Sequence, residues 1–185
     1  MVSSYLNSII LELSNNHNKI KEEQLQNFIQ MIQKSNKIFV SGKGRSGLMI
    51  SAFANRLLHL GYDVSVIGEI TTPHTEKNDL LIIASGSGET DSLISMAKKA
   101  KDSQVNEILI TTNKESKLGK LANCVVEVPG VSKVAKSVDG ITSIQPMGAV
   151  FEQMLALLMD AVVLELMEIN SINSDMMIAK HANLE

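Results

Sequence analysis

Five short apolar segments in the middle of the chain limit the folds that it can adopt. Each is nearly free of alternation between apolar and polar residues, which is typical of strands buried on both faces of a parallel sheet. Helical periodicity follows three of them, at residues 46–60, 90–101 and 116–122. We therefore predict an α/β fold, a three-layer αβα sandwich in which the right-handed crossover rule places helices on both faces of a five-stranded parallel sheet. The predicted strands cover residues 37–41, 63–67, 79–84, 107–111 and 124–128.

Two helical patterns precede this alternation, within residues 1–34. Apolar residues recur at three- and four-residue spacing on both sides of a polar linker at residues 14–18. A chain of 185 residues, of which 44% are apolar, suits one domain with a sizeable core. We therefore predict a single domain over residues 1–185, with residues 1–34 as a helical extension and residues 35–185 as the α/β core.

The composition argues against several classes of protein. With a net charge of −3 and 3% aromatic residues, the chain offers no basic stripe or stacking platform for nucleic acid. It shows no uncharged run of membrane-spanning length, no signal-peptide pattern and no Cys/His spacing typical of zinc. The single cysteine, Cys124, lies in an apolar run and is expected to be a small buried side chain. We expect a cytoplasmic protein that binds neither nucleic acid nor a membrane.

The longest apolar segment predicts a helix over residues 147–169 that is apolar on almost every side. Pro146 precedes it, in keeping with the preference of proline for the start of a helix. The polar residues 129–146 are predicted to form a long loop, and long loops in compact domains are usually functional or mobile. A helix that is apolar all round must be buried, and a sandwich of this size does not bury all of it alone. We therefore predict a homo-oligomer.

A glycine-rich turn, Ser41-Gly-Lys-Gly-Arg-Ser-Gly47, follows the first predicted strand and precedes a helix. Gly42, Gly44 and Gly47 have the spacing of the dinucleotide-binding fingerprint, and Glu69 occupies the place of its ribose-binding acid. A dinucleotide-dependent oxidoreductase is therefore one alternative. By themselves, the glycines indicate only that backbone amides approach an anion closely at a helix N-terminus.

A second turn, Ser85-Gly-Ser-Gly-Glu-Thr90, follows the third predicted strand and precedes another helix. Hydroxyl groups and free helical amides both donate hydrogen bonds to phosphate oxygens. Two such turns at the carboxyl edge of one sheet favour a small phosphorylated ligand, because sheets of this kind bind ligands at that edge. The alternative is that Ser46, Ser87 and Thr90 are only helix N-caps. The predicted phosphate-binding residues are Gly44, Arg45, Ser46, Ser85, Ser87 and Thr90.

The two turns resemble those of the sugar isomerase (SIS) fold, and further segments narrow the resemblance to the 6-phospho-3-hexuloisomerase family. The resemblance covers nearly the whole chain, and the Gln-Pro-Met-Gly and His-Ala-Asn-Leu-Glu motifs are its most specific parts. It implies a five-stranded parallel sheet, a homotetramer, no metal, no cofactor, and a place in the ribulose monophosphate pathway of formaldehyde fixation. The implied reaction converts D-arabino-3-hexulose 6-phosphate to fructose 6-phosphate. The segments are Arg56–Gly61, Gly68–Pro73, Ser143–Gln153 and Lys180–Glu185.

That reaction needs a base for the C2 proton, a donor for the 2,3-enediolate and a group that returns the proton at C3. The match around Glu152 assigns this residue as the base, although the residues alone favour equally a carboxylate stabilised by the helix dipole. As acid or proton shuttle we favour His181, in a tail that folds over its own or a neighbouring subunit's site, ahead of His59. Arg45 is expected to add positive charge at the phosphate or the enediolate.

Two other functions within the same fold remain open at this point. One is a sugar-phosphate sensor without catalysis, although the N-terminal extension is short and poor in Lys and Arg for a DNA-binding segment. The other is an aldose–ketose isomerase that acts on arabinose 5-phosphate, although such relatives usually carry an extra regulatory domain.

Overall fold

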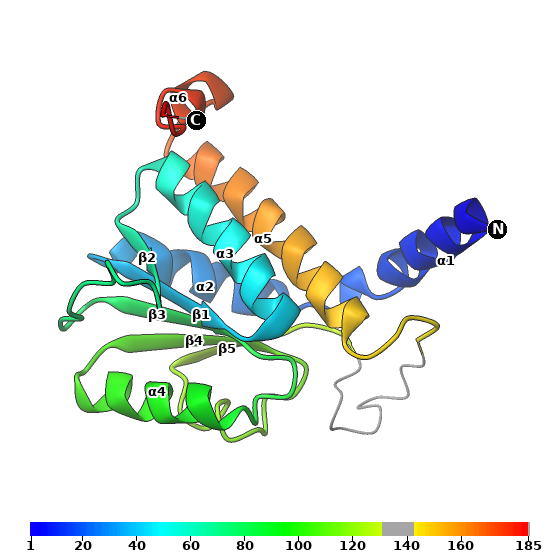
Figure 1. Cartoon of the computed structure of the whole chain (residues 1–185), viewed down its shortest axis with the longest axis horizontal. Coiled ribbons are helices and arrows are strands. Elements are labelled where there is room, and N and C mark those ends of the chain that lie inside the picture. The colour runs from blue at the N-terminus through cyan, green and yellow to red at the C-terminus, as the bar shows by residue number, and fades with distance from the viewer. Residues whose placement is uncertain (131–142, 185) are drawn as a thin grey trace.

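The five predicted strands form one parallel sheet in this computed structural model, which describes residues 1–130 and 143–184 (Figure 1). Each strand begins and ends within one residue of its predicted position, so the strand prediction is confirmed. The strands lie in the order β2-β1-β3-β4-β5. They are β1 (Ile38–Gly42), β2 (Val64–Val66), β3 (Leu80–Ala84), β4 (Asn106–Thr111) and β5 (Cys124–Glu127).

Helices cover both faces of the sheet, which confirms the three-layer αβα sandwich. On one face lie α2 (Glu22–Lys34), α3 (Gly44–Leu60) and α5 (Ala149–Ile169), and on the other lies α4 (Asp91–Asp102) (Figure 1). Successive strand residues point to opposite faces. The side chains of Ile38 and Val40 accordingly pack into the first of these layers, whereas that of Phe39 packs towards α4.

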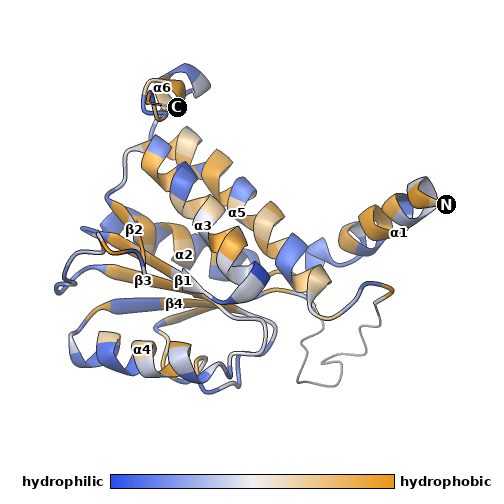
Figure 2. Ribbon diagram, viewed as in Figure 1, coloured by the Kyte–Doolittle hydropathy of each residue, from blue (hydrophilic) through white to orange (hydrophobic). Residues whose placement is uncertain are grey.

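The N-terminal extension begins with α1 (Val2–Ser14), which extends away from the sheet (Figure 1). A short 3-10 helix, His17–Lys19, then leads into α2. No residue of α1 is buried, although apolar residues lie along it (Figure 2). None of the helices in the described residues is long and apolar enough to cross a membrane.

The helix predicted over residues 116–122 is wrong, because this segment forms a series of turns. Two of its backbone amides bind the turn after β3, which holds the segment in turns. Leu118 N donates to the Gly88 carbonyl oxygen at 3.1 Å, and Lys117 N donates to Glu89 Oε1 at 2.9 Å. The two loops are therefore joined, a result that local periodicity does not reveal.

The long apolar helix α5 begins at Ala149, two residues later than predicted, and buries one side against α3 and the sheet. The side chains of Leu157 and Leu164 remain exposed on its other side. The long loop predicted before it, at residues 129–146, lies mostly outside the described residues.

Cys124 begins β5 and is half-buried, not fully buried as expected. It packs against the core beneath α2, and its Sγ lies 4.0 Å from the Gln24 carbonyl oxygen. Burial raises the pKa of its thiol, which therefore stays protonated and behaves as a small apolar side chain.

A carboxyl group is buried at the amino end of β4. Glu107 is 2% exposed, and its Oε1 has no hydrogen-bond partner among the described residues. Burial raises the pKa of Glu107 to about 7, and the nearby charge of Lys101 opposes this shift only in part. A hydrogen bond from Glu107 N to Asn123 Oδ1, at 2.8 Å, fixes the backbone at this position.

We predict that Glu107→Gln raises the free energy of unfolding at pH 8 by up to about 3 kcal/mol and changes it little below about pH 4. The unfolded chain loses this proton near its ordinary pKa of about 4.3, while the folded chain holds it to about pH 7. Stability of the native protein therefore falls between those values and stays lower above them. Urea unfolding at both pH values measures the effect. The exposed Glu115, changed to Gln, is the matched control, and equal stabilities of wild type and Glu107→Gln at pH 8 would contradict the prediction.

Candidate active site

A cleft of about 250 Å³ lies where the turns after β1 and β3 meet. The two strands are neighbours, and Gly42 pairs with Ala84 at their carboxyl ends, so the turns begin side by side. All six predicted phosphate-binding residues line this cleft, which are Gly44, Arg45, Ser46, Ser85, Ser87 and Thr90. Glu152, the predicted base, lines it as well.

The turn after β1 is built on a close approach between strand and helix. A Cβ at Gly47 would lie 2.8 Å from the Gly42 carbonyl oxygen, and one at Gly42 would lie 3.0 Å from Gly47 Cα. Gly44 lies between them with φ +58, a conformation that glycine adopts without strain. Packing therefore accounts for the glycine spacing, and Glu69, the candidate ribose-binding acid, does not line the cleft.

The hydroxyl groups of the second turn are arranged to donate. Gly88 N donates to Ser85 Oγ and Glu89 N donates to Ser87 Oγ, each at 3.2 Å. A hydroxyl that accepts a bond in this way keeps its own proton for another acceptor. Both serines can therefore donate to an anion in the cleft.

None of the hydroxyls of Ser46, Ser87 and Thr90 makes a helix-capping hydrogen bond, and only Thr90 occupies an N-cap position. Ser87 binds Glu89 N within the turn, and Ser46 lies inside α3, whose N-cap residue is Lys43. Thr90 does occupy the N-cap position of α4, but its side chain makes no capping hydrogen bond. Its hydroxyl is therefore also left for a ligand.

Glu152 enters the cleft from the first turn of α5. Its side chain is only 12% exposed, and its Oε2 lies 3.0 Å from Nη1 of Arg45, which is 54% exposed. A carboxylate and a guanidinium are thus paired at the opening of the cleft. This pair holds the carboxylate in place and puts positive charge next to it.

The two candidate histidines lie elsewhere. His59 is near the C-terminal end of α3 and His181 is in the exposed tail after α6 (Ser174–Ile178); their rings stack with centroids 5.2 Å apart. Burial lowers the pKa of His59, and the charges of His181 and Arg56 lower it further. Fourteen residues of straight helix separate His59 from Arg45, or about 21 Å. One chain therefore does not bring either histidine to the cleft.

Several residues of the cleft were not identified from the sequence. Gly148 and Phe151 line it beside Glu152, and Lys43 lines it before Gly44. Behind it, buried Thr111 and Thr112 hold the turn after β3 through hydrogen bonds to the Gly86 carbonyl oxygen. In the sequence, the only sign of this support was a pair of adjacent threonines at the end of the neighbouring predicted strand.

Comparison with known proteins shows which family the chain is similar to. Residues 31–157 match the SIS domain family. A Bacillus subtilis protein named 3-hexulose-6-phosphate isomerase is 44% identical, with 99% of this chain and 98% of that protein covered. A protein of the same name from Methylomonas aminofaciens is 34% identical over the full length of both. These matches confirm the resemblance seen in the sequence.

A solved structure gives the same result at the level of the fold. A hypothetical protein from Methanococcus jannaschii, for which a molecular function of 3-hexulose-6-phosphate isomerase has been inferred, superimposes with a TM-score of 0.82. It is 34% identical, and the comparison covers 98% of this chain and 99% of that one.

We predict that Gly47→Ala destabilises the protein by about 2 kcal/mol or more, because its methyl group would meet the Gly42 backbone. Gly44→Ala is the matched comparison. Its methyl group meets nothing within 4 Å, so only the positive φ opposes it, at about 1 kcal/mol. Thermal unfolding of both variants measures the difference. Equal losses of stability would show that close approach is not the reason for Gly47.

Proposed function

The chain belongs to the SIS domain family, and we propose that it converts D-arabino-3-hexulose 6-phosphate to fructose 6-phosphate. The observation that carries this proposal is the cleft itself. A shielded carboxylate, Glu152, lies opposite two turns that present hydroxyl and amide donors. Donors for a phosphate at one side and a base at the other are what a phosphosugar isomerase requires.

The phosphate group of the substrate would bind between the two turns. Hydroxyl protons of Ser85, Ser87 and Thr90 and the free amides at the start of α3 and α4 supply hydrogen bonds. The phosphate then anchors C6 and leaves the carbon chain to extend towards Glu152. Binding at a group remote from the reacting carbons positions them for proton transfer.

The substrate is open-chain when it binds. Its carbonyl is at C3, O6 carries the phosphate, and attack by O5 would close only a strained four-membered ring. The site therefore needs no acid for ring opening. It needs only groups that move a proton between C2 and C3.

Glu152 removes the C2 proton, and the C–H electrons form the C2–C3 double bond while the C3 carbonyl oxygen gains the negative charge. The guanidinium of Arg45, 3.0 Å from Glu152, can stabilise this enediolate. The O2 proton then leaves, a carbonyl forms at C2, and the proton held by Glu152 is delivered to C3. No net electrons are gained or lost, so the reaction itself calls for no redox cofactor.

The proton that leaves O2 must reach O3, and this transfer needs a second group. We assign this role to His59 and His181 of a neighbouring subunit. The lowered pKa of His59 keeps its imidazole neutral near pH 7, a form that both accepts and donates a proton. A homotetramer would bring the far end of one α3 to the cleft of another chain. The exposed apolar side chains of α1 and of Leu157 and Leu164 on α5 offer surface for such contacts.

Three further points belong to this proposal. We place the enzyme in the ribulose monophosphate pathway, in the cytoplasm, and we infer that it acts without a metal ion. The described residues contain no cluster of three or more metal-ligating side chains.

We predict that Glu152→Gln lowers kcat by about a thousandfold, because the amide keeps the shape but cannot take a proton. The substrate is generated from formaldehyde and ribulose 5-phosphate, and fructose 6-phosphate is read through a glucose 6-phosphate dehydrogenase couple. Glu165→Gln, at an exposed carboxylate on the same helix, should keep full activity. Full activity of Glu152→Gln would rule out this mechanism, and phosphate binding without turnover by the wild type would favour a sensor.

We predict that two inactive variants restore activity when they are co-refolded. Glu152→Gln subunits supply intact histidines, and His59→Asn or His181→Asn subunits supply intact Glu152. If each site is shared between two chains, random assembly restores about a quarter of the sites. Refolding each variant alone is the control. No recovery from a mixed oligomer of normal size would show that the histidines do not act across subunits.

A further inference from the structure

The carbonyl oxygen of Gly86, in the turn after β3, accepts three hydrogen bonds. Thr112 Oγ1 donates at 2.8 Å, Thr112 N at 3.1 Å and Thr111 Oγ1 at 3.1 Å. All three donors come from the end of β4, the strand next to β3. A carbonyl oxygen has two lone pairs, so this one is fully used and its direction is set by the neighbouring strand.

The direction of this carbonyl fixes the direction of the next amide. In a planar trans peptide unit, the C=O and the N–H that follows it point in opposite directions. With the Gly86 carbonyl aimed at β4, the Ser87 N–H points away from β4. Since β3 lies between β4 and β1, that is the side of the turn after β1, where Arg45 lines the cleft. Ser87 N has no acceptor among the described residues, and Ser87 itself lines the cleft.

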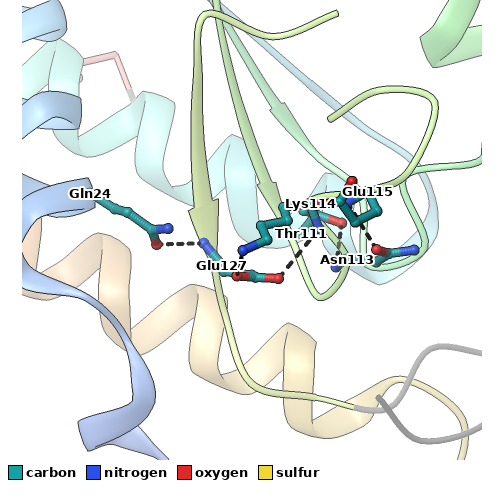
Figure 3. Close-up of polar contacts among 6 residues, drawn as sticks. All are labelled: Gln24, Thr111, Asn113, Lys114, Glu115 and Glu127. Atoms are coloured by element: carbon teal, nitrogen blue, oxygen red, sulfur yellow. Dashed lines mark hydrogen bonds and ion pairs between the residues drawn. The ribbon is translucent and has the colours of Figure 1, made fainter. Parts of the chain in front are cut away.

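The two threonines are themselves held rigidly. Both are buried, and the Thr111 hydroxyl accepts a bond from Asn113 N at 3.2 Å, so that its own proton is directed elsewhere (Figure 3). Glu127 at the end of β5 supports this turn, with Oε1 3.5 Å from Lys114 N (Figure 3). Gln24 of α2 in turn accepts a bond from Glu127 N at 3.0 Å (Figure 3).

The segment that follows β4 also binds the negatively charged side chain of the turn after β3. Glu89, within the turn, accepts a bond from Lys117 N at 2.9 Å and pairs with Lys117 Nζ at 3.0 Å. These bonds lower the pKa of Glu89, so it stays ionised but is directed towards Lys117. Both the carbonyl dipole and the carboxylate of the turn are thus held by residues 111–118.

We propose that Thr112, assisted by Thr111, is a positioning residue that aims the Ser87 amide at the phosphate group of the ligand. Neither threonine touches the ligand. Their hydroxyls instead fix the peptide unit between Gly86 and Ser87 before the anion arrives, so that no rearrangement opposes binding. For the sugar phosphate this inference rests on the proposed function, whereas for inorganic phosphate it stands alone.

The test compares Thr112→Val, which removes the hydroxyl at nearly constant shape, with Thr112→Ser, which keeps it. Thr72→Val is the matched control, because the Thr72 hydroxyl also binds backbone carbonyls, those of Val66 and Glu69, outside the cleft. Calorimetric titration gives the Kd for inorganic phosphate, and the coupled assay gives KM and kcat. Thermal unfolding shows that each variant is folded.

For Thr112→Val we expect the phosphate Kd and the KM each to rise about tenfold, with kcat within about twofold, because a contact remote from the reacting carbons contributes equally to substrate and transition state. Thr112→Ser and Thr72→Val should stay within about twofold of wild type. If Thr112→Val does not fold, Thr111→Val removes the other hydroxyl and should raise Kd about threefold.

Three results would overturn the inference. These are an unchanged Kd in a folded Thr112→Val, an equal loss in Thr112→Ser, and a wild type that does not bind phosphate. If the wild type binds phosphate but does not turn over the hexulose phosphate, the proposed function fails. The comparison of Kd values then still decides the role of Thr112.

Discussion

The parallel pairing of β1 with β3 is the constraint on which the rest of the cleft depends. Gly42 lies opposite Ala84 in this register, so both strands end at the same level and release their turns side by side. The close approach of Gly47 to Gly42 then starts α3 immediately at the strand end. Helix amides and serine hydroxyls converge only because these two turns begin side by side at the same edge of the sheet.

The electrostatics of the cleft follow from what faces this edge. Arg45 from α3 and Glu152 from α5 meet across it at 3.0 Å, and the carboxylate is much the more shielded of the two. In the proposed function, the exposed guanidinium can reorient towards an incoming phosphate or enediolate, whereas the shielded carboxylate stays near the reacting carbons. The pair therefore suits a reaction in which negative charge develops beside the base.

Local patterns predicted those parts that depend on neighbours in the sequence. The strands and the cleft residues of the two glycine-rich turns were predicted because apolar runs, glycines and hydroxyls are local signals. Glu152 was assigned through the family resemblance, because the residues around it did not by themselves distinguish a base from a carboxylate at a helix start. The segment 116–122 was predicted wrongly because the amides of Lys117 and Leu118 bind Glu89 and Gly88, which are distant in the sequence. Thr112 was missed for the same reason, since its partner Gly86 is reached only when β3 and β4 pair.

The two histidines lie far from the cleft of their own chain. Helix α3 joins the cleft, at Arg45, to His59 at its far end, and a helix of this length keeps these two residues about 21 Å apart. Glu152 is paired with Arg45, so it lies at the same end of α3 and away from His59. A proton relay that uses both groups therefore cannot form within a single subunit. The cleft and the histidines thus lie at opposite ends of α3, and in the proposed function a second subunit brings its histidines to the cleft of the first.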